Sequence, residues 1–179
     1  MKVAVITFIG LSIIGLSGLS AAESPPVLGA VTVDFELVDR EGQVVTLDDF
    51  SGQNVLLAFG FTHCLHICPM IAANMARATQ STDKAVVGLF ISVDTERDSP
   101  TITDDYAKRF SEKMIGLGGS HDQIAAAAKN FHATFVVTKS ESNYTVQHTP
   151  SIFLIGPDGS LIDVFAMNAQ SGAIAAAMQ

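Results

Sequence analysis

The sequence is poor in basic residues and lacks several motifs that mark common activities. Its 179 residues include 10 lysines and arginines against 18 aspartates and glutamates, which gives a formal net charge of −8. Such a surface repels nucleic acid and anionic lipid headgroups. No glycine-rich phosphate loop is present, and no Ser–His–Asp arrangement or nucleophile elbow indicates a hydrolase. We therefore expect no nucleic-acid partner and find nucleotide-binding and hydrolytic functions poorly supported.

Cysteine is also scarce, since the chain contains only Cys64 and Cys68. A cysteine pair in an exported protein most often forms a structural disulfide. The spacing argues against that interpretation, because a bridge between residues one helical turn apart constrains the unfolded chain little. The pair instead lies between a continuous apolar run, 55–59, and a helix-forming segment, 70–76. The carboxyl end of a buried strand is where ligands tend to bind in α/β sheets, so we expect a copper or redox site.

The N-terminus has the pattern of an export signal. Lys2 precedes an apolar run, 3–19, and Ser20-Ala21-Ala22 suits signal-peptidase cleavage before Glu23. The run also approaches the roughly 20 residues of a membrane span, so an uncleaved anchor is the alternative. Either way, we expect a periplasmic domain, free or anchored to the inner membrane. The predicted divisions are a signal peptide or anchor, a tether, and one domain: residues 1–22, 23–31 and 32–179.

The rest of the chain alternates between strand and helix patterns. An N-terminal β-hairpin is predicted from two alternating runs around a glycine-containing turn. Further strands are expected at 55–59, 85–93, 114–117, 135–138, 143–146, 151–155 and 161–165, and helices at 68–79, 100–112, 122–131 and 171–178. Right-handed crossovers favour one central sheet with helices on both faces. This order predicts an α/β, thioredoxin-like fold with an N-terminal hairpin and an insertion between its halves.

The two thiols are expected on the first turn of a helix, where they could bridge or share one ion. A helix N-terminus favours the thiolate, the reactive and metal-binding form. Two thiolates alone rarely hold a metal. His148 is the favoured third ligand, because it is expected just before the strand 151–155, on the loop that in this fold lies over the thiol-bearing turn. Two thiolates and one imidazole suit Cu(I). A structural zinc needs a fourth ligand, for which His66 is available, whereas we interpret His121 and His132 as ordinary helix-end residues.

Four segments, in family order from about Phe35 to the C-terminus, resemble the Sco/SenC copper proteins. They are FGFTHCLHICP (59–69), ISVDTERDSP (91–100), YTVQHT (144–149) and FLIGPDG (153–159). Peroxiredoxins share the fold and the hairpin but lack the cysteine pair. The resemblance implies a thioredoxin-like fold and one copper ion bound through two cysteines and a histidine, which match Cys64, Cys68 and His148. It also implies a role in assembling the binuclear copper site of cytochrome c oxidase, by delivering copper, reducing that site's cysteines, or both.

The chain departs from the family pattern at four positions near these ligands. Leu65 and His66 stand where the family has proline and an acidic residue, Gln147 replaces an aspartate, and Thr95 replaces a proline. We expect the loss of two carboxylates and the gain of an imidazole to change copper affinity, redox potential and partner docking. Pro150, which is not usual after the family's histidine, stands at about the position of the thioredoxin cis proline, so we predict a cis bond before it.

Two functions follow from these residues. The first is a copper metallochaperone that binds Cu(I), with Cu(II) as a further candidate, and passes it to a subunit of cytochrome c oxidase or to another copper protein. The alternative is a thiol–disulfide oxidoreductase in which Cys64 and Cys68 form a redox pair and keep a partner's cysteines reduced. The second function does not need His148, and this difference separates the two. A third class, an interaction domain that merely retains the motif, is the least supported.

Overall fold

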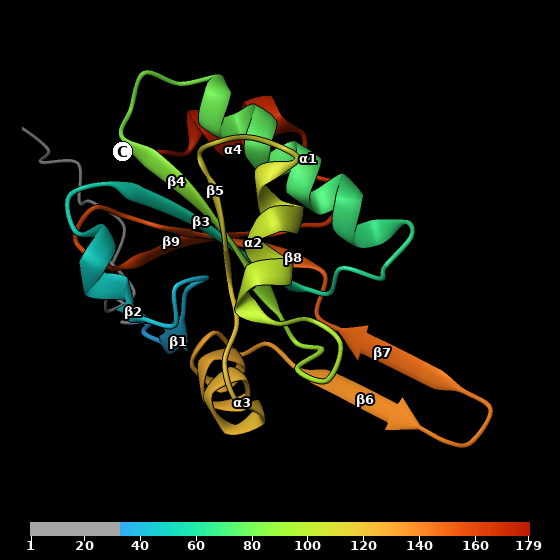
Figure 1. Cartoon of the computed structure of the whole chain (residues 1–179). Coiled ribbons are helices and arrows are strands. Elements are labelled where there is room, and N and C mark those ends of the chain that lie inside the picture. The colour runs from blue at the N-terminus through green and yellow to red at the C-terminus, as the bar shows by residue number, and fades with distance from the viewer. Residues whose placement is uncertain (1–32) are drawn as a thin grey trace, which may run out of the picture.

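The structure, a computed structural model, describes residues 33–179 and contains a five-stranded central sheet (Figure 1). The strands are β1 (Glu36–Val38), β2 (Val44–Thr46), β3 (Asn54–Gly60), β4 (Val86–Ser92), β5 (Met114–Leu117), β6 (Phe135–Lys139), β7 (Tyr144–His148), β8 (Ser151–Ile155) and β9 (Leu161–Ala166). The helices are α1 (Ile67–Gln80), α2 (Pro100–Lys108), α3 (His121–Asn130), α4 (Ser171–Ala176) and the 3₁₀ helix η1 (Leu47–Phe50). The predicted signal peptide and tether lie outside the described residues.

The central sheet has the strand order β5-β4-β3-β8-β9. β3 is parallel to β4 and antiparallel to β8, and β4 is parallel to β5. Every residue of β3 and β4 is buried, as expected for strands covered on both faces. This burial explains why both appear in the sequence as unbroken apolar runs rather than as alternating patterns.

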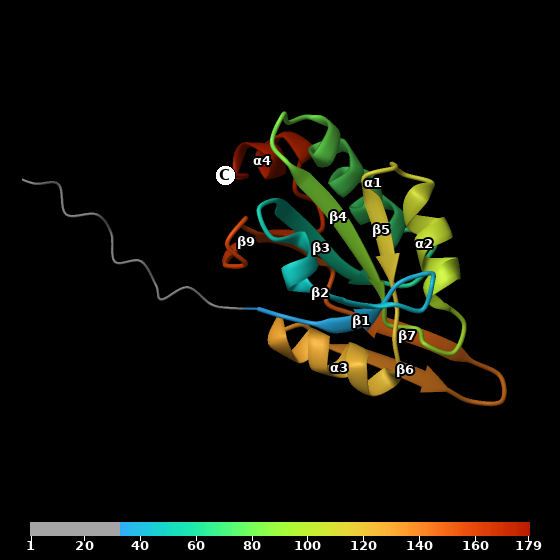
Figure 2. The same cartoon turned by 60° about the vertical axis from the view of Figure 1, so that its left-hand side comes forward.

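The two faces of the sheet carry two separate hydrophobic clusters. Leu57 and Phe59 of β3 point toward α3 and the N-terminal hairpin, whereas Leu56 and Ala58 point toward α1, α2 and α4. Figure 2 shows this layering, with α3 and β1 on one side of the sheet and α1, α2 and α4 on the opposite side. The expected α/β, thioredoxin-like sheet flanked by helices is confirmed, including the antiparallel β1–β2 hairpin.

The β6–β7 hairpin forms its own two-stranded sheet and extends from the body of the domain (Figure 1). It corresponds to the antiparallel pair predicted at 135–138 and 143–146, although β7 continues to His148. The expected loop position of His148 is therefore wrong, since the residue ends a strand and pairs with Phe135.

The expectation of a cis bond before Pro150 is also wrong, because residues 33–179 contain no cis peptide bond. The Thr149 amide donates a hydrogen bond to the Thr134 carbonyl at 2.9 Å, which extends the β6–β7 ladder by one step. The chain thus stays extended as it passes from β7 into β8, and the trans form that X–Pro bonds favour by default is retained. This finding weakens the comparison with thioredoxins.

Two predicted helices are shorter than expected. α2 ends at Lys108 rather than near residue 112, and α4 ends at Ala176 rather than at 178. Ser99 caps α2 through its hydroxyl and Pro100 opens it, as predicted. No helix within 33–179 combines the length and the apolar character that crossing a membrane would require.

Candidate metal centre

The cysteine pair occupies the turn that joins β3 to α1. β3 ends at Gly60, and the Cys64 amide donates to the Phe61 carbonyl at 3.3 Å, which tightens the turn before the helix. The Cys68 amide, in the first turn of α1, donates to Cys64 Sγ at 3.3 Å. Both thiols are free, with Cys64 half-buried and Cys68 only 1% exposed. Cys68 therefore lies on the first turn of the helix as predicted, whereas Cys64 lies in the turn before it, three residues ahead of Ile67.

The two thiols differ in acidity. Burial raises the pKa of Cys64, but hydrogen bonds from the Cys68 thiol and from nearby backbone amides outweigh it, and the net shift is downward. Burial is the main cause that raises the pKa of Cys68 well above its usual range, and the hydrogen bond to Cys64 is the second. Cys64 is therefore the thiol that forms a thiolate more readily, and it is also the more exposed of the two.

His148 reaches the cysteines from the end of β7. Its Nε2 lies 3.3 Å from Cys68 Sγ, and its Nδ1 lies 3.1 Å from the Thr149 carbonyl oxygen. Because a carbonyl can only accept, Nδ1 carries the proton and Nε2 of the neutral ring presents its lone pair to the sulfur. The Phe61 ring meets the imidazole edge-on, with ring centroids 5.9 Å apart. Burial lowers the pKa of His148, partly opposed by the hydrogen bond to Thr149, so the site favours the neutral ring.

These three residues fit the chemistry of a soft metal ion, although they are not yet gathered around one point. Cys68 and His148 are in contact, and Cys64 is linked to Cys68. Within residues 33–179, no three histidine, cysteine, aspartate or glutamate side chains are already grouped as a metal site. The donors themselves are suitable, because two thiols and an imidazole whose second nitrogen donates to a carbonyl form a ligand set for Cu(I).

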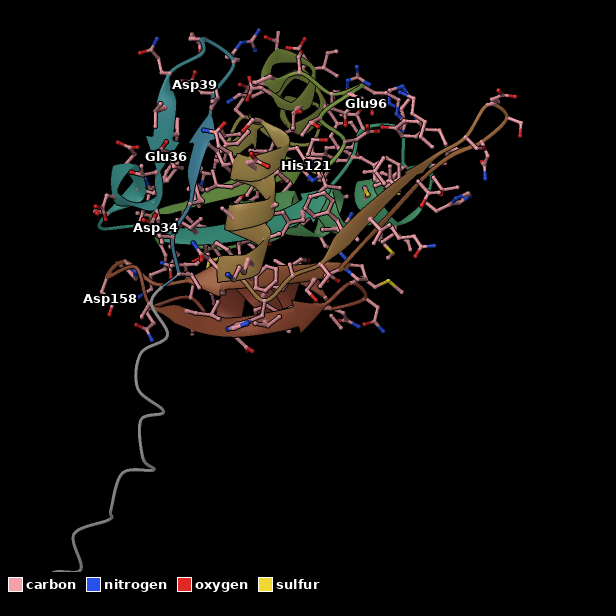
Figure 3. The ribbon with its side chains drawn as sticks, turned by 90° about the horizontal axis from the view of Figure 1, so that it is seen from below. Asp34, Glu36, Asp39, Glu96, His121 and Asp158 are labelled. Atoms are coloured by element: carbon pink, nitrogen blue, oxygen red, sulfur yellow. The ribbon has the colours of Figure 1, made fainter. Side chains whose placement is uncertain are left out.

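Of the other histidines, His66, His121 and His132 take no part in this arrangement, whereas His63 Nδ1 lies 3.5 Å from Asp98 Oδ1 beside the cysteine turn. His66 is exposed at the N-cap of α1 and makes no side-chain cap hydrogen bond there. His121 is the first residue of α3, where Figure 3 labels it, and its ring packs against Phe135 at 5.6 Å. His132 follows α3 with a positive φ of 52°. A zinc site completed by His66 thus gains no support, and the helix-end interpretation of His121 and His132 agrees with their positions.

Sequence reasoning assigned no role to the charged loop after β4, yet this loop holds the cysteine turn. The Asp98 side chain is fully buried and accepts hydrogen bonds from Thr62 N at 2.7 Å, Thr62 Oγ1 at 2.6 Å and Ser92 Oγ at 2.6 Å. Thr62 lies two residues before Cys64, so a buried carboxylate fixes the approach to the first thiol. Its position in the sequence could have indicated this role: the loop follows β4, which runs parallel to β3, so it leaves the sheet at the same edge as the cysteine turn.

Comparison with known proteins identifies the family. The SCO1/SenC family model matches residues 25–179. The chain belongs to the SCO1/SenC family. The human mitochondrial SCO1 homologue is 37% identical over 161 residues, which cover 86% of this chain and 52% of that protein. This chain thus spans about half the length of that SCO1/SenC relative.

Two solved SCO1/SenC structures agree with the fold. Copper-bound ScoI of Arabidopsis thaliana superposes with a TM-score of 0.73 at 33% identity, covering 82% of this chain and 94% of that one. BsSco, described as having a disulfide switch and as a member of the Sco family of cytochrome c oxidase assembly proteins, superposes with a TM-score of 0.63 at 26% identity. That match covers 83% of this chain and 91% of BsSco.

Proposed function

We propose that this protein is a periplasmic copper metallochaperone that helps assemble the binuclear copper site of cytochrome c oxidase. Its cargo is one copper ion, held by Cys64, Cys68 and His148. Family membership, the copper-bound Arabidopsis relative and the assembly role stated for BsSco support this function. The predicted export signal supports the location. The receiving partner is then a copper-binding subunit of the oxidase or another copper protein.

The contact between Cys68 and His148 is the observation that carries the proposal. A buried thiol and an imidazole lone pair lie 3.3 Å apart, although 80 residues separate them in the sequence. Burial favours the protonated Cys68 thiol and the neutral His148 ring until a copper ion arrives, and copper binding then releases thiol protons. The more exposed Cys64 is the donor that an incoming partner thiol can displace first. Transfer by stepwise ligand exchange follows from this asymmetry.

An anaerobic Cu(I) titration of the reduced protein tests the proposal. Wild type should bind one equivalent, while Cys64→Ala and His148→Ala should each lower the affinity or stoichiometry markedly. His121→Ala is a matched control, because it removes an imidazole that lies away from the thiols. Unchanged affinity in His148→Ala would overturn the proposed ligand set, and loss of binding in His66→Ala would favour the four-ligand zinc-type site instead.

A second function, thiol–disulfide exchange, is supported by the difference in pKa and exposure between Cys64 and Cys68. The Cys64 thiolate would attack one sulfur of a partner disulfide and form a mixed disulfide, releasing one partner thiolate. Cys68, after losing its proton, would attack Cys64 Sγ and release the second partner thiol. The partner gains two electrons, and this protein is left with a Cys64–Cys68 disulfide.

The Cys68→Ser variant tests this exchange, because it lacks the resolving thiol. It should accumulate a mixed disulfide with a model disulfide substrate, and His148→Ala should exchange as wild type does. An exchange that requires His148, or a Cys68→Ser protein that traps nothing, would count against the oxidoreductase function. Periplasmic localisation is checked separately by fractionating cells that express the full chain.

A further inference from the structure

The loop after β4, residues 94–98, also touches the hairpin that carries His148. The Tyr144 hydroxyl donates to Asp94 Oδ1 at 2.5 Å, and Tyr144 lies four residues before His148 in β7. The Asp94 side chain is fully buried. Figures 1 and 2 show this loop, between β4 and α2, beside the hairpin. The loop therefore reaches the histidine side of the site as well as the cysteine side.

Arg97 lies between the hairpin and the cysteine turn. Its Nε donates to Asp94 Oδ2 at 2.5 Å, and its guanidinium also forms an ion pair with that carboxylate. The guanidinium carbon lies 4.0 Å from the centre of the Tyr144 ring and 6.0 Å from that of Phe61. Phe61 in turn packs edge-on against the His148 ring. One cation thus joins the two segments that carry the candidate ligands.

The hairpin has few other attachments that could fix its orientation. Its strands alternate between partly buried and exposed residues, and only Phe135 and Val146 among its side chains pack against a core cluster. A two-stranded ribbon is marginally stable on its own. Its orientation therefore depends on the contacts with the loop after β4, which meet the hairpin at the Lys139–Tyr144 pair next to its turn, while His148 lies at the other end of β7. A small rotation of the ribbon would move the imidazole away from the thiols.

We propose that Asp94, Arg97 and Tyr144 form a brace that positions His148 against Cys64 and Cys68 and so sets the affinity for copper. This inference rests on the proposed copper-binding function. None of the three residues is offered as a ligand. They act by fixing the position of His148, since residues that hold a metal ligand in place control its orientation and the affinity for the metal.

A fourth contact between loop and hairpin provides a matched control. Lys139 Nζ lies 2.5 Å from Glu96 Oε2, and Figure 3 shows Glu96 on the loop beside the hairpin. Both side chains are more than half exposed, and exposed ion pairs contribute little because water and salt screen them. Lys139→Met therefore removes one loop–hairpin contact without disturbing the brace.

The first measurement is Cu(I) affinity, by competition with a chromophoric Cu(I) chelator under anaerobic conditions on the full chain. Tyr144→Phe keeps the ring over Arg97 and loses one hydrogen bond to a buried carboxylate, so we expect about fivefold weaker binding. Arg97→Ala removes the ion pair and both ring contacts, so we expect about tenfold weaker binding or more. Lys139→Met should bind as wild type does. Should Arg97→Ala fail to fold, Tyr144→Phe decides the question.

The second measurement needs no copper. In the reduced, metal-free protein, the ¹⁵N NMR signals of the His148 ring should shift in Tyr144→Phe and stay unchanged in Lys139→Met. A wild-type protein that fails to bind Cu(I) would refute the proposed function, and the ring signals would then test the brace alone. Wild-type affinity and wild-type ring signals in both Tyr144→Phe and Arg97→Ala would overturn the brace.

Discussion

The two segments that carry the candidate ligands are built in opposite ways. The cysteine turn connects a fully buried strand to a helix that packs in a hydrophobic cluster, and Cys68 belongs to that cluster. The histidine stands on a two-stranded hairpin whose residues alternate between partly buried and exposed. One half of the site is therefore part of the core, and the other half rests against it.

This difference separates stability from ligand placement. Damage to the cysteine half disturbs the core and should lower the free energy of unfolding. Damage to the hairpin half should move His148 while costing little stability, because few core contacts depend on the hairpin. The proposed copper site thus combines two thiols on a turn anchored to the core with one ligand on a separate hairpin.

Asp98→Ala should give the largest effect, because it removes the buried carboxylate that anchors the cysteine turn. Three hydrogen bonds from Thr62 and Ser92 lose their acceptor. Leaving these donors without a partner should destabilise the fold by about 3 kcal/mol in urea unfolding. Asp98→Asn, which retains one acceptor oxygen, should lose less. A loss below about 1 kcal/mol in the alanine variant would contradict the view that this half is rigidly anchored.

Gly60→Ala should have the next largest effect. A Cβ at this position would lie 2.5 Å from Phe90 Cζ and 3.2 Å from Cys68 Sγ. Phe90 is fully buried and has no room to turn aside, so overpacking should cost about 2 kcal/mol. Val136→Ala, on the hairpin at a side chain 58% exposed, should change stability by less than about 0.5 kcal/mol. Equal losses in the two variants would remove the distinction between the halves.

The same contrast explains what could be predicted from the sequence. The strand at 55–59 and the helix after it were predictable, because burial on both faces leaves an unbroken apolar run and a proline fits the first helical turn. The approach of His148 to the thiols was predicted from the expected fold and from family resemblance, since no local pattern encodes a contact across 80 residues.

Other features of the site could not be predicted from local pattern. Asp94 and Asp98 resemble ordinary solvated charges in the sequence, yet both side chains are buried among hydrogen-bond donors supplied by other segments. The isomer at Pro150 likewise depends on its surroundings, and the extended passage from β7 to β8 keeps it trans. Tertiary contacts, rather than propensity, decide each of these features.

The ionisation of Tyr144 tests whether the hairpin rests on Asp94 in solution. Burial, followed by the hydrogen bond to Asp94, raises the pKa of Tyr144 to about 12. The neutral phenol is favoured in the folded protein, so this contribution to stability is complete below the unfolded pKa of about 10 and is lost as the pH rises through 12. The chain has two tyrosines and no tryptophan, so absorbance of a Tyr106→Phe protein reports Tyr144 alone. Ionisation near pH 10 would show that the hairpin is detached from Asp94.

Tyr106→Phe itself should have the smallest effect and completes the comparison. Tyr106 packs against Phe90 in the cluster that contains Cys68, and its buried hydroxyl has no hydrogen-bond partner among residues 33–179. Removing a buried hydroxyl that makes no hydrogen bond should leave the free energy of unfolding unchanged or raise it by less than about 1 kcal/mol. Tyr144→Phe, by contrast, loses the hydrogen bond from the Tyr144 hydroxyl to Asp94. If Tyr106→Phe were the more destabilising of the two, the core side would depend on a polar contact of its own, and its rigidity could not be ascribed to apolar packing and Asp98.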